Sequence, residues 1–283
     1  MDILKLKNRI EAELNDDEFF RNHCFIVGGF VRDILMGFVP KDMDIVVDVE
    51  HGSLKLALKL HNIFKEETVY PRRLGKYPIW QLAFIKGEFA GESIEIAETM
   101  SEEFPDKFSR QRMVKFSLLE DDIKRRDFTI NSLLMKFCCG EGIDSIIDYS
   151  GYGIDDIRKN KVIRCIPSVS AIEILSADPL RILRAVRFSV RFGWKIEDNT
   201  FKAMKEVKDR INILSSERIL KELELISKYS YGLLRAVMIL DKIDALGIIF
   251  PEVEYLKNIK QAPDERNIHL EGSEFYCKNF ILK

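Results

Sequence analysis

The chain has 283 residues, of which 46% are hydrophobic and 32% are charged, and its formal net charge is −2. This composition predicts a globular chain of about two domains and argues against a protein that coats nucleic acid non-specifically. No apolar run of about eighteen residues is present, so no transmembrane helix is expected, and the charged N-terminus lacks a signal-peptide core.

The cysteines show neither a zinc-binding spacing nor a disulfide framework. Cys138 and Cys139 are adjacent, which suits neither a CxxC metal clip nor an ordinary disulfide. Free thiols in a reducing compartment are therefore expected, and the chain is predicted to be cytoplasmic. The set consists of Cys24, Cys138, Cys139, Cys165 and Cys277.

The first part of the chain alternates short strands with helices. Apolar residues at helical spacing predict a helix over residues 1–20, and short β-branched runs bounded by Gly, Pro or polar residues predict strands. This pattern predicts an α/β (α+β) domain with a small mixed sheet. Further strands are predicted over 25–27, 44–49, 68–70, 79–85, 93–97 and 114–118, helices over 31–36, 52–64 and 121–134, and a mobile polar loop over 100–113.

From about residue 155 the strand signals vanish and only helical spacing remains, over 171–191, 198–209, 215–228 and 230–246. Roughly the last twenty residues have little periodicity and are expected to be irregular. We therefore predict a head domain over 1–140, an all-helical neck over 141–228, and an abbreviated helical body with an irregular tail over 229–283.

Gly28 and Gly29 stand between the predicted strand 25–27 and the following helix. Glycines at this place let the backbone approach a phosphate closely, and the amino end of a helix favours anions. A tight strand-to-helix turn without a ligand is the alternative interpretation.

Three carboxylates fall on neighbouring predicted strands. Asp42 and Asp44 are one residue apart and are expected to point the same way, and Glu95 shares a face with Ser93 and Ala97. Adjacent carboxylates repel each other, and a divalent cation relieves this repulsion. Beside a turn that accommodates phosphate, they form the layout of two-metal phosphoryl transfer with two Mg²⁺ ions. A solvated turn and a plain surface strand are the alternatives.

Arginines recur at helical spacing over residues 181–191. Asp178 and Arg181 stand at spacing i, i+3 on the predicted helix over 171–191, so they project together and offer both an acceptor and donors to a nucleobase edge. An ordinary intrahelical ion pair is the alternative. Arg181, Arg184, Arg187 and Arg191 fall within an arc of about 120° on a helix, where they line either a phosphate-binding groove or a solvated face.

Five motifs in one order resemble those of class II tRNA nucleotidyltransferases and bacterial poly(A) polymerases, of the polymerase-beta-like nucleotidyltransferase superfamily. They cover about residues 22–255. The motifs are GGFVRDILMG with KDMDIVV, DDIKRRDFTINSLLM, IIDYSGYGIDDIRKNKVIR, ADPLRILRAVRFSVRFGW and SSERILKELELI.

The resemblance implies a role for each matching residue. Asp42 and Asp44 hold the catalytic metals, and Glu95 assists or activates the RNA 3′-hydroxyl. Asp178 and Arg181 pair with the incoming base and replace a template. The residues implied to bind the nucleotide's phosphates and ribose are Gly28, Gly29 and Arg32, supported by Asp33, and Arg125, Arg126, Asp127 and Asn131. From the helical pattern of arginines, Arg184 and Arg187 are also predicted to bind the nucleotide.

The sequence departs from the family's pattern at two positions. Ala177 stands where the family usually has Glu before the base-reading Asp, and Met100 stands where an Arg commonly follows the third carboxylate's strand. The family also normally continues past 283 residues into further helices or an HD-type domain that grip the tRNA. A truncated, minimal or partner-dependent form is therefore an expectation.

The leading hypothesis is a nucleotidyltransferase that adds CMP and AMP from CTP and ATP to the tRNA 3′ end with Mg²⁺. The long segment between Glu95 and Asp121 favours full CCA addition or terminal A addition over CC addition. A poly(A) polymerase, a non-catalytic RNA-binding remnant and a nucleotide-sensing module remain alternatives. The expected partner is the tRNA 3′ end rather than a membrane, and the oligomeric state stays open.

Overall fold

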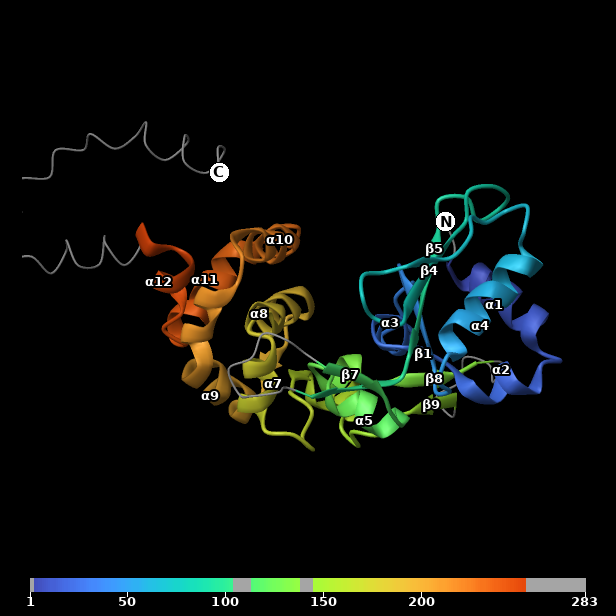
Figure 1. The fold of residues 1–283 in the computed structure, drawn as a ribbon. Helices are drawn as coiled ribbons and strands as arrows, with labels where there is room; N and C mark the ends of the chain where they lie inside the picture. Colours follow the sequence, from blue (N-terminus) through green and yellow to red (C-terminus); the bar gives the residue numbers. More distant parts are fainter. Residues whose placement is uncertain (1–2, 104–112, 138–144, 253–283) are drawn as a thin grey trace, which may run out of the picture.

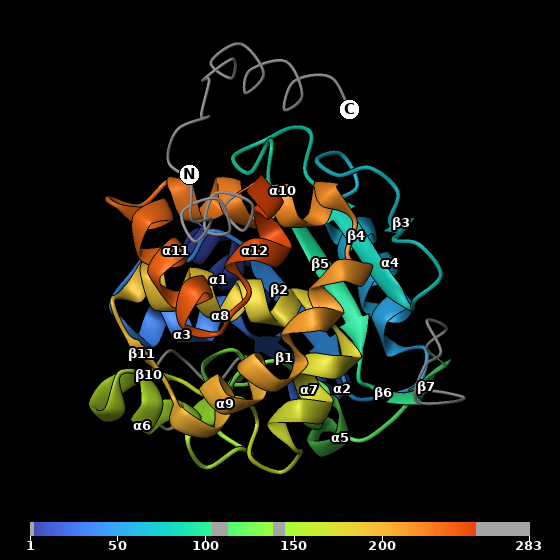
Figure 2. The same cartoon turned by 90° about the vertical axis from the view of Figure 1, so that its left-hand side faces the viewer.

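The protein is described by a computed structural model that covers residues 3–103, 113–137 and 145–252. A mixed sheet with its helices is followed along the chain by a helical region, α7 to α12 (Figure 1). In this view the helical region lies on one side of the sheet, and helices α1, α2 and α4 lie on the opposite side. Figure 2 looks onto the helical region with the strands behind it.

The main sheet has seven strands and mixed directions, which confirms the predicted fold class. The central strands β1 and β2 are antiparallel, β2 and β5 are parallel, and β4 runs antiparallel to β5. In spatial order the strands are β3 (Arg72–Arg73), β4 (Ile79–Ala83), β5 (Ser93–Glu98), β2 (Met43–Val47), β1 (Cys24–Val27), β8 (Leu134–Lys136) and β9 (Ile146–Ile147).

Strand β5 shows how alternation of side chains gives the sheet two different faces. Ile94 and Ile96 are fully buried in the main core, whereas Glu95 on the other face is exposed. The helices around the sheet are α1 (Ile3–Leu14), α2 (Glu18–His23), α3 (Gly29–Leu35) and α4 (Gly52–Ile63). The predicted single helix over 1–20 is divided in two, because Asp17 caps the start of α2 by accepting hydrogen bonds from the backbone of Phe19 and Phe20.

Several expected elements in the sheet region were wrong. At 68–70 only Thr68 forms an isolated bridge, with Phe84. The expected loop over 100–113 begins with strand β6 (Met100–Glu103), which pairs with β7 (Met113–Phe116), while residues 104–112 lie outside the described residues. The helix expected over 121–134 ends early: α5 covers Leu119–Lys124 and is followed by a 3₁₀ turn (Thr129–Asn131) and strand β8.

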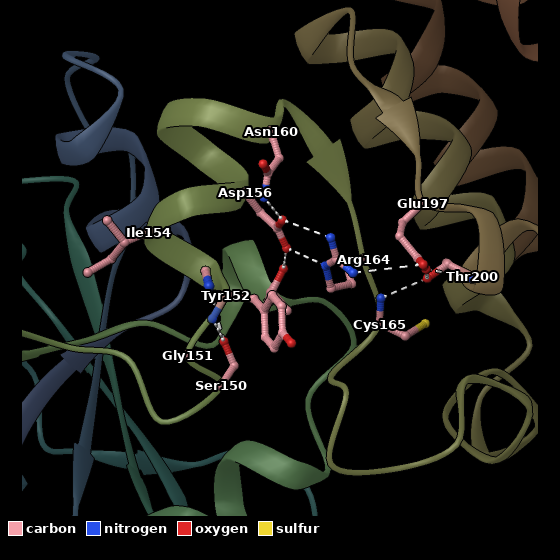
Figure 3. Close-up of polar contacts among 12 residues, drawn as sticks. Ser150, Gly151, Tyr152, Ile154, Asp156, Asn160, Arg164, Cys165, Glu197 and Thr200 are labelled. Carbon is pink, nitrogen blue, oxygen red and sulfur yellow. Dashed lines mark hydrogen bonds and ion pairs between the residues drawn. The ribbon is translucent and has the colours of Figure 1, made fainter.

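The link between the sheet and the helical region is held by a buried carboxylate (Figure 3). Asp156 is fully buried and accepts hydrogen bonds from Thr129 Oγ1 at 2.8 Å, Asn160 Nδ2 at 2.9 Å and Arg164 Nε at 2.9 Å. Arg164 also lies 3.8 Å from Glu197. The segment consists of α6 (Gly153–Asp155), a π-helix (Asp156–Asn160), and strand β10 (Val162–Ile163), which pairs with β11 (Lys195–Ile196). The expectation that strands vanish after about residue 155 was therefore wrong.

The helical region contains one break that the spacing pattern did not predict. The helix expected over 171–191 is interrupted at Asp178 and Pro179, because Asp178 is extended with φ −143° and ψ 100°. A residue before proline is driven out of the helical conformation. The helices are α7 (Ala171–Ala177), α8 (Leu180–Phe192), α9 (Asp198–Val207), a 3₁₀ segment (Lys208–Ile213), α10 (Ser216–Ser227), α11 (Gly232–Lys242) and α12 (Leu246–Ile249).

One continuous hydrophobic cluster runs through both regions, from Ile3 to Leu246. Phe128 from the sheet side meets Phe188 of α8 with ring centroids 6.0 Å apart. The predicted domain boundaries at 140 and 228 stay predictions, and the predicted irregular tail lies outside the described residues. No helix in the described ranges is long and apolar enough to span a bilayer. Cys24 and Cys165 are buried, while the other three cysteines fall in undescribed segments.

Candidate active site

Two of the predicted catalytic carboxylates are direct neighbours in the sheet. Asp44 of β2 is paired with Glu95 of β5, so both side chains project from the same face about 5 Å apart at the backbone. Asp42 immediately precedes β2. The structure therefore brings the three carboxylates together at the amino end of β2.

These carboxylates have no direct polar partner among the described side chains. In the part of the chain that the structure describes, Asp42, Asp44 and Glu95 form no ion pair and no side-chain hydrogen bond. The pKa of Asp44 is raised to about 6, first because the surrounding protein displaces water from its carboxylate, and then because Glu95 repels its charge. Arg126 acts in the opposite direction but does not cancel the shift. Asp44 still reaches solvent.

The turn that follows β1 requires glycine. Gly28 has φ +72° and ψ −125°, a conformation that other residues rarely adopt, and its N–H donates to the carbonyl of Leu133 at 3.1 Å. A Cβ atom at this position would lie 3.8 Å from Nη1 of Arg126. The glycine turn, the Arg126 guanidinium and the Asp44 carboxylate are therefore neighbours.

Asp122 holds both arginines of the Arg125–Arg126 pair. Its carboxylate is fully buried and accepts two hydrogen bonds from each: from Arg125 at 2.6 and 2.9 Å and from Arg126 at 2.9 and 3.1 Å. The backbone N–H of Met100 adds a fifth at 3.1 Å. Burial alone would raise the pKa of Asp122, but Arg126 and Arg125 hold it below its ordinary value. Both arginines thus bind a carboxylate that precedes them by three and four residues in the chain.

A second network joins the predicted ribose- and phosphate-binding residues to each other. Asp127 accepts a hydrogen bond from Asn131 at 3.1 Å and pairs with Arg184 of α8 at 2.7 Å. Asn131 in turn accepts a hydrogen bond from Arg32 Nη1 at 2.6 Å. Burial alone would raise the pKa of Asp127, but Arg184 and Arg181 hold it below its ordinary value.

Arg32 lies inside the protein and not on the surface of the turn. It is 5% exposed, binds the Asp33 carboxylate through Nε at 2.8 Å, and lies 5.3 Å from the ring centroids of both Phe188 and Phe192. Burial lowers its pKa, although Asp33 partly offsets this effect. Asp33 also accepts a hydrogen bond from Arg191 at 3.1 Å. This predicted phosphate ligand thus connects the glycine turn to helix α8.

The arginine stripe of α8 is engaged by partners from other elements. Arg184 binds Asp127, Arg187 binds Glu222 of α10 at 2.6 Å, and Arg191 binds Asp33. Arg181 donates to the backbone carbonyls of Ile174 at 2.9 Å and Arg125 at 2.6 Å. The stripe therefore joins α8 to the sheet region and to α10.

Asp178 and Arg181 do not lie on one helix as expected, because α7 ends at Ala177 and α8 begins at Leu180. The Asp178 carboxylate pairs with Arg218 of α10, at 3.0 and 3.1 Å. The expected intrahelical ion pair at spacing i, i+3 depended on a continuous helix. Whether the two side chains read a base remains a prediction.

Sequence reasoning missed Asp122, Glu222, Arg218 and Phe188 as members of the site. Asp122 carried a local signal, since it precedes Arg126 by four residues on a predicted helix. Glu222 and Arg218 carried none, because their partners are 35 and 40 residues away along the chain. Across the described ranges, no group of three or more His, Cys, Asp or Glu residues is arranged to hold a metal ion by itself.

Two family descriptions match this sequence. "Poly A polymerase head domain" matches residues 24–164, and "Probable RNA and SrmB- binding site of polymerase A" matches residues 193–257. The chain belongs to the poly(A) polymerase head-domain family. Membership in this nucleotidyltransferase family, together with the tRNA nucleotidyltransferases described next, confirms the resemblance seen in the motifs.

Relatives of this chain include both A-adding and CCA-adding enzymes. It is 38% identical to an A-adding tRNA nucleotidyltransferase of Aquifex aeolicus over 186 residues, which are 65% of this chain and 20% of the relative. It is 32% identical to a CCA-adding enzyme of Lactococcus lactis over 202 residues, 71% of this chain and 45% of the relative. The chain thus spans less than half the length of these two relatives.

Solved structures of the family share the fold over most of the chain. The Thermotoga maritima CCA-adding enzyme complexed with tRNA has a TM-score of 0.66 at 28% identity, covering 88% of this chain and 52% of that one. A CCA-adding enzyme with ATP gives 0.65 at 29% identity, covering 88% and 53%. The Bacillus stearothermophilus enzyme with CTP gives 0.62 at 27% identity, covering 84% and 51%.

Proposed function

We propose that the chain is a template-independent tRNA nucleotidyltransferase that adds CMP and AMP from CTP and ATP to the tRNA 3′ end. The observation that carries this proposal is the cluster of Asp42, Asp44 and Glu95, which are acceptors without protein partners in the described part of the chain. The cluster lies beside a glycine turn and the Arg126 guanidinium. Relatives with A-adding and CCA-adding activity support the reaction class.

The carboxylates fit divalent magnesium by their chemistry. Mg²⁺ prefers oxygen ligands and usually takes only one or two carboxylates, with water and substrate phosphates completing the set. Asp42 and Asp44 supply two such carboxylates. The pKa of Asp44 is raised by its burial and by the negative charge of Glu95, and a bound cation would offset both effects. When bound, the ions would neutralise charge that develops on the attacking and leaving oxygens.

The chain's own residues would orient the reactants. Gly28 leaves room for the triphosphate, and Arg126 offers Nη1 beside it while Asp122 fixes the other side of its guanidinium. The RNA 3′-oxygen forms a bond to the α-phosphorus, the bond to the β-phosphate oxygen breaks, and pyrophosphate leaves. Glu95 would accept the proton of the 3′-hydroxyl, since it lies next to Asp44 on the far side from Gly28.

Four of the predicted nucleotide-binding residues would mainly position the site, because they bind one another: Arg32, Asn131, Asp127 and Arg184. Asp178 and Arg181, at the break between α7 and α8, would select the nucleobase through hydrogen bonds. Terminal A addition alone is the second candidate, and the 38% identity to an A-adding relative favours it.

The test is incorporation by the purified chain with Mg²⁺ on tRNAs that end before CCA, after C and after CC. Each receives CTP, ATP or both, and an unrelated RNA serves as control. Completion of CCA confined to tRNA is expected. A-only addition to the CC-ending tRNA would identify an A-adding enzyme, and long A tails on every RNA would identify a poly(A) polymerase.

Variants separate catalysis from folding. Asp44→Asn is expected to lower incorporation on the order of 10³-fold. Asp48→Asn is the matched control, because Asp48 directly follows the same strand but pairs with His23 at 2.8 Å. Nucleotide binding without incorporation by the wild-type chain would indicate a non-catalytic binding protein instead.

A further inference from the structure

The row of paired residues that contains the catalytic carboxylates continues to the edge of the sheet. Asp44 is paired with Glu95, Glu95 with Gln81 of β4, and Gln81 with Arg72 of β3. Residues that face each other across a sheet project from the same face. Arg72 and Gln81 therefore share the face of Asp44 and Glu95, with Arg72 about 10 Å from Glu95 across two strand spacings.

This face of β4 and β5 differs from the opposite one. Leu82, Ile94 and Ile96 point into the core on the side where α4 contacts these strands. On the catalytic face the small, half-buried pair Ala83 and Ser93 flanks the row on one side, and the half-buried pair Ile79 and Ala97 flanks it on the other. In Figure 1 helices α1 and α4 lie on one side of β4 and β5, and the helical region lies on the other.

Arg72 differs from the arginines of the active site in its partners. Its Nη2 donates to Gln81 Oε1 at 3.0 Å, its side chain is exposed, and it forms no ion pair with any described residue. Arg126, Arg184 and Arg187 each bind a carboxylate of the protein. The Gln81 contact orients one edge of the Arg72 guanidinium and leaves its other N–H groups available to an outside acceptor.

The positions of the two substrates relative to Asp44 indicate which acceptor would bind Arg72. Gly28 follows β1, which borders β2 on one side, so the triphosphate would lie on the β1 side of Asp44. The attacking and leaving oxygens lie in line on opposite sides of the α-phosphorus. The attacking 3′-hydroxyl must then approach from the β5 side, and the strand that carries it would continue over β4 and β3.

We propose that Arg72, oriented by Gln81, binds the phosphodiester backbone of the single-stranded RNA 3′ end just upstream of its terminal nucleotide. This inference rests on the proposed function for the direction of the strand. A guanidinium is suited to phosphate because its planar donors match two phosphate oxygens. On the side of the row that carries Ala83 and Ser93, the small side chains leave room for the RNA backbone to approach the sheet.

The experiment measures RNA binding directly by fluorescence anisotropy, without turnover. The probe is a fluorescein-labelled RNA hairpin with a single-stranded 3′ extension that ends in CC, and the same hairpin without the extension is the reference. Arg72→Ala is expected to weaken binding of the extended hairpin about tenfold. It should also reduce the slope of log K against log salt by about 0.7 to 1. Binding of the blunt hairpin should stay unchanged.

Arg73→Ala is the matched control. Arg73 is the next residue of β3, so it points to the other face, and its guanidinium binds the backbone carbonyls of Tyr77 and Lys76. Arg73→Ala removes the same charge from the same pair of strands, β3 and β4, yet affinity for the extended RNA should change less than twofold. Gln81→Ala, which keeps the charge but removes its anchor, should lose about threefold.

Equal losses in Arg72→Ala and Arg73→Ala, or wild-type affinity and salt slope in Arg72→Ala, would overturn the inference. Steady-state kinetics adds a second readout: Arg72→Ala should raise KM for the tRNA and leave KM for ATP unchanged. If the wild type incorporates nucleotide and Arg72→Ala binds RNA normally, the inference fails while the proposed function stands. If no nucleotide is incorporated but Arg72→Ala still loses binding, the RNA surface stands and the proposed function fails.

Discussion

Arg184 of α8 and Asp127 form an ion pair at 2.7 Å that connects the helical region to the sheet region. Asp127 is 7% exposed and also accepts hydrogen bonds from Asn131 and from the backbone of Phe128. Through Asn131 the pair is linked to Arg32 and thus to the glycine turn. A contact between distant segments is therefore part of the network that joins the helical region to the glycine turn.

Removal of Arg184 should destabilise the protein strongly. In Arg184→Ala the Asp127 carboxylate stays buried without its main partner, and we expect a loss of roughly 2–4 kcal/mol in the free energy of unfolding. Urea denaturation at pH 7 measures it. Arg158→Ala, at an exposed position, is the control and should change stability by less than about 0.5 kcal/mol. A loss no larger than the control's would show that the pair is dispensable.

The ion pairs of Asp122 should make stability depend on acidity. The folded pKa of Asp122 lies below its ordinary value of 3.8, so its contribution is present above that value and is lost as the pH falls through the folded pKa. In Asp122→Asn this contribution is absent at every pH. The stability difference between wild type and variant should therefore be large at pH 7 and shrink at about pH 3.

Thermal unfolding at the two pH values measures this difference, with Asp121→Asn as the control. Asp121 is the preceding residue and pairs with Lys124 in an exposed salt bridge, so its loss should matter little. A stability gap for Asp122→Asn that persists unchanged in acid would contradict the prediction. Where Asp122→Asn still folds, KM for the nucleotide should rise, because Arg126 is no longer fixed beside Gly28.

Site residues that stand within one strand or one motif could be predicted from the sequence. Contacts between elements that are distant in the chain could not, because they depend on how the elements pack. The pairing of Asp44 with Glu95 followed from two strands of clear character and from the family motif. The pairing of Arg187 with Glu222 joins two helices, and one sequence does not specify which helix faces meet. Pro179 did carry a usable signal for the helix break, and helical periodicity on both sides concealed it.

The fold was predicted best where pattern and length agreed. Strand β5 and helix α4 were found almost at their bounds, because strict alternation and a long apolar period specify them. Strands β3 and β9 have two residues each and were missed, since pairs this short form only through their neighbours in the sheet. Polar residues at 100–103 indicated a loop, but pairing with β7 makes them a strand.

Asp44 should show a conflict between stability and activity. Its folded pKa of about 6 lies above the ordinary 3.8, so the folded protein binds the proton more tightly, and stability falls as the pH rises from about 4 to 6. Asp44→Asn removes a charge that the fold disfavours. In EDTA at pH 7 the variant should melt at a higher temperature than the wild type, although its incorporation of nucleotide with Mg²⁺ is strongly reduced.

Calorimetry in EDTA at pH 7 and at about pH 4 tests this, and the gain in melting temperature should vanish at the lower pH, where the wild-type carboxyl is protonated. Glu95→Gln removes the repulsion that is the second cause of the shift, so it should lower the pKa of Asp44. Destabilisation by Asp44→Asn at pH 7 would show that the carboxylate has a stabilising partner.

Gly28 and Gly29 should respond differently to alanine, although they are adjacent. Gly28→Ala forces a non-glycine residue into φ +72° and ψ −125°, which costs about 1–3 kcal/mol and shifts the turn beside Arg126. Gly29 is the first residue of α3, and an added Cβ would meet Arg32 Nη2 at an ordinary contact distance of 3.4 Å. Gly29→Ala should therefore fold with near wild-type stability, as urea denaturation would show. If both variants lose stability equally, the conformation of Gly28 is not what makes the first glycine necessary.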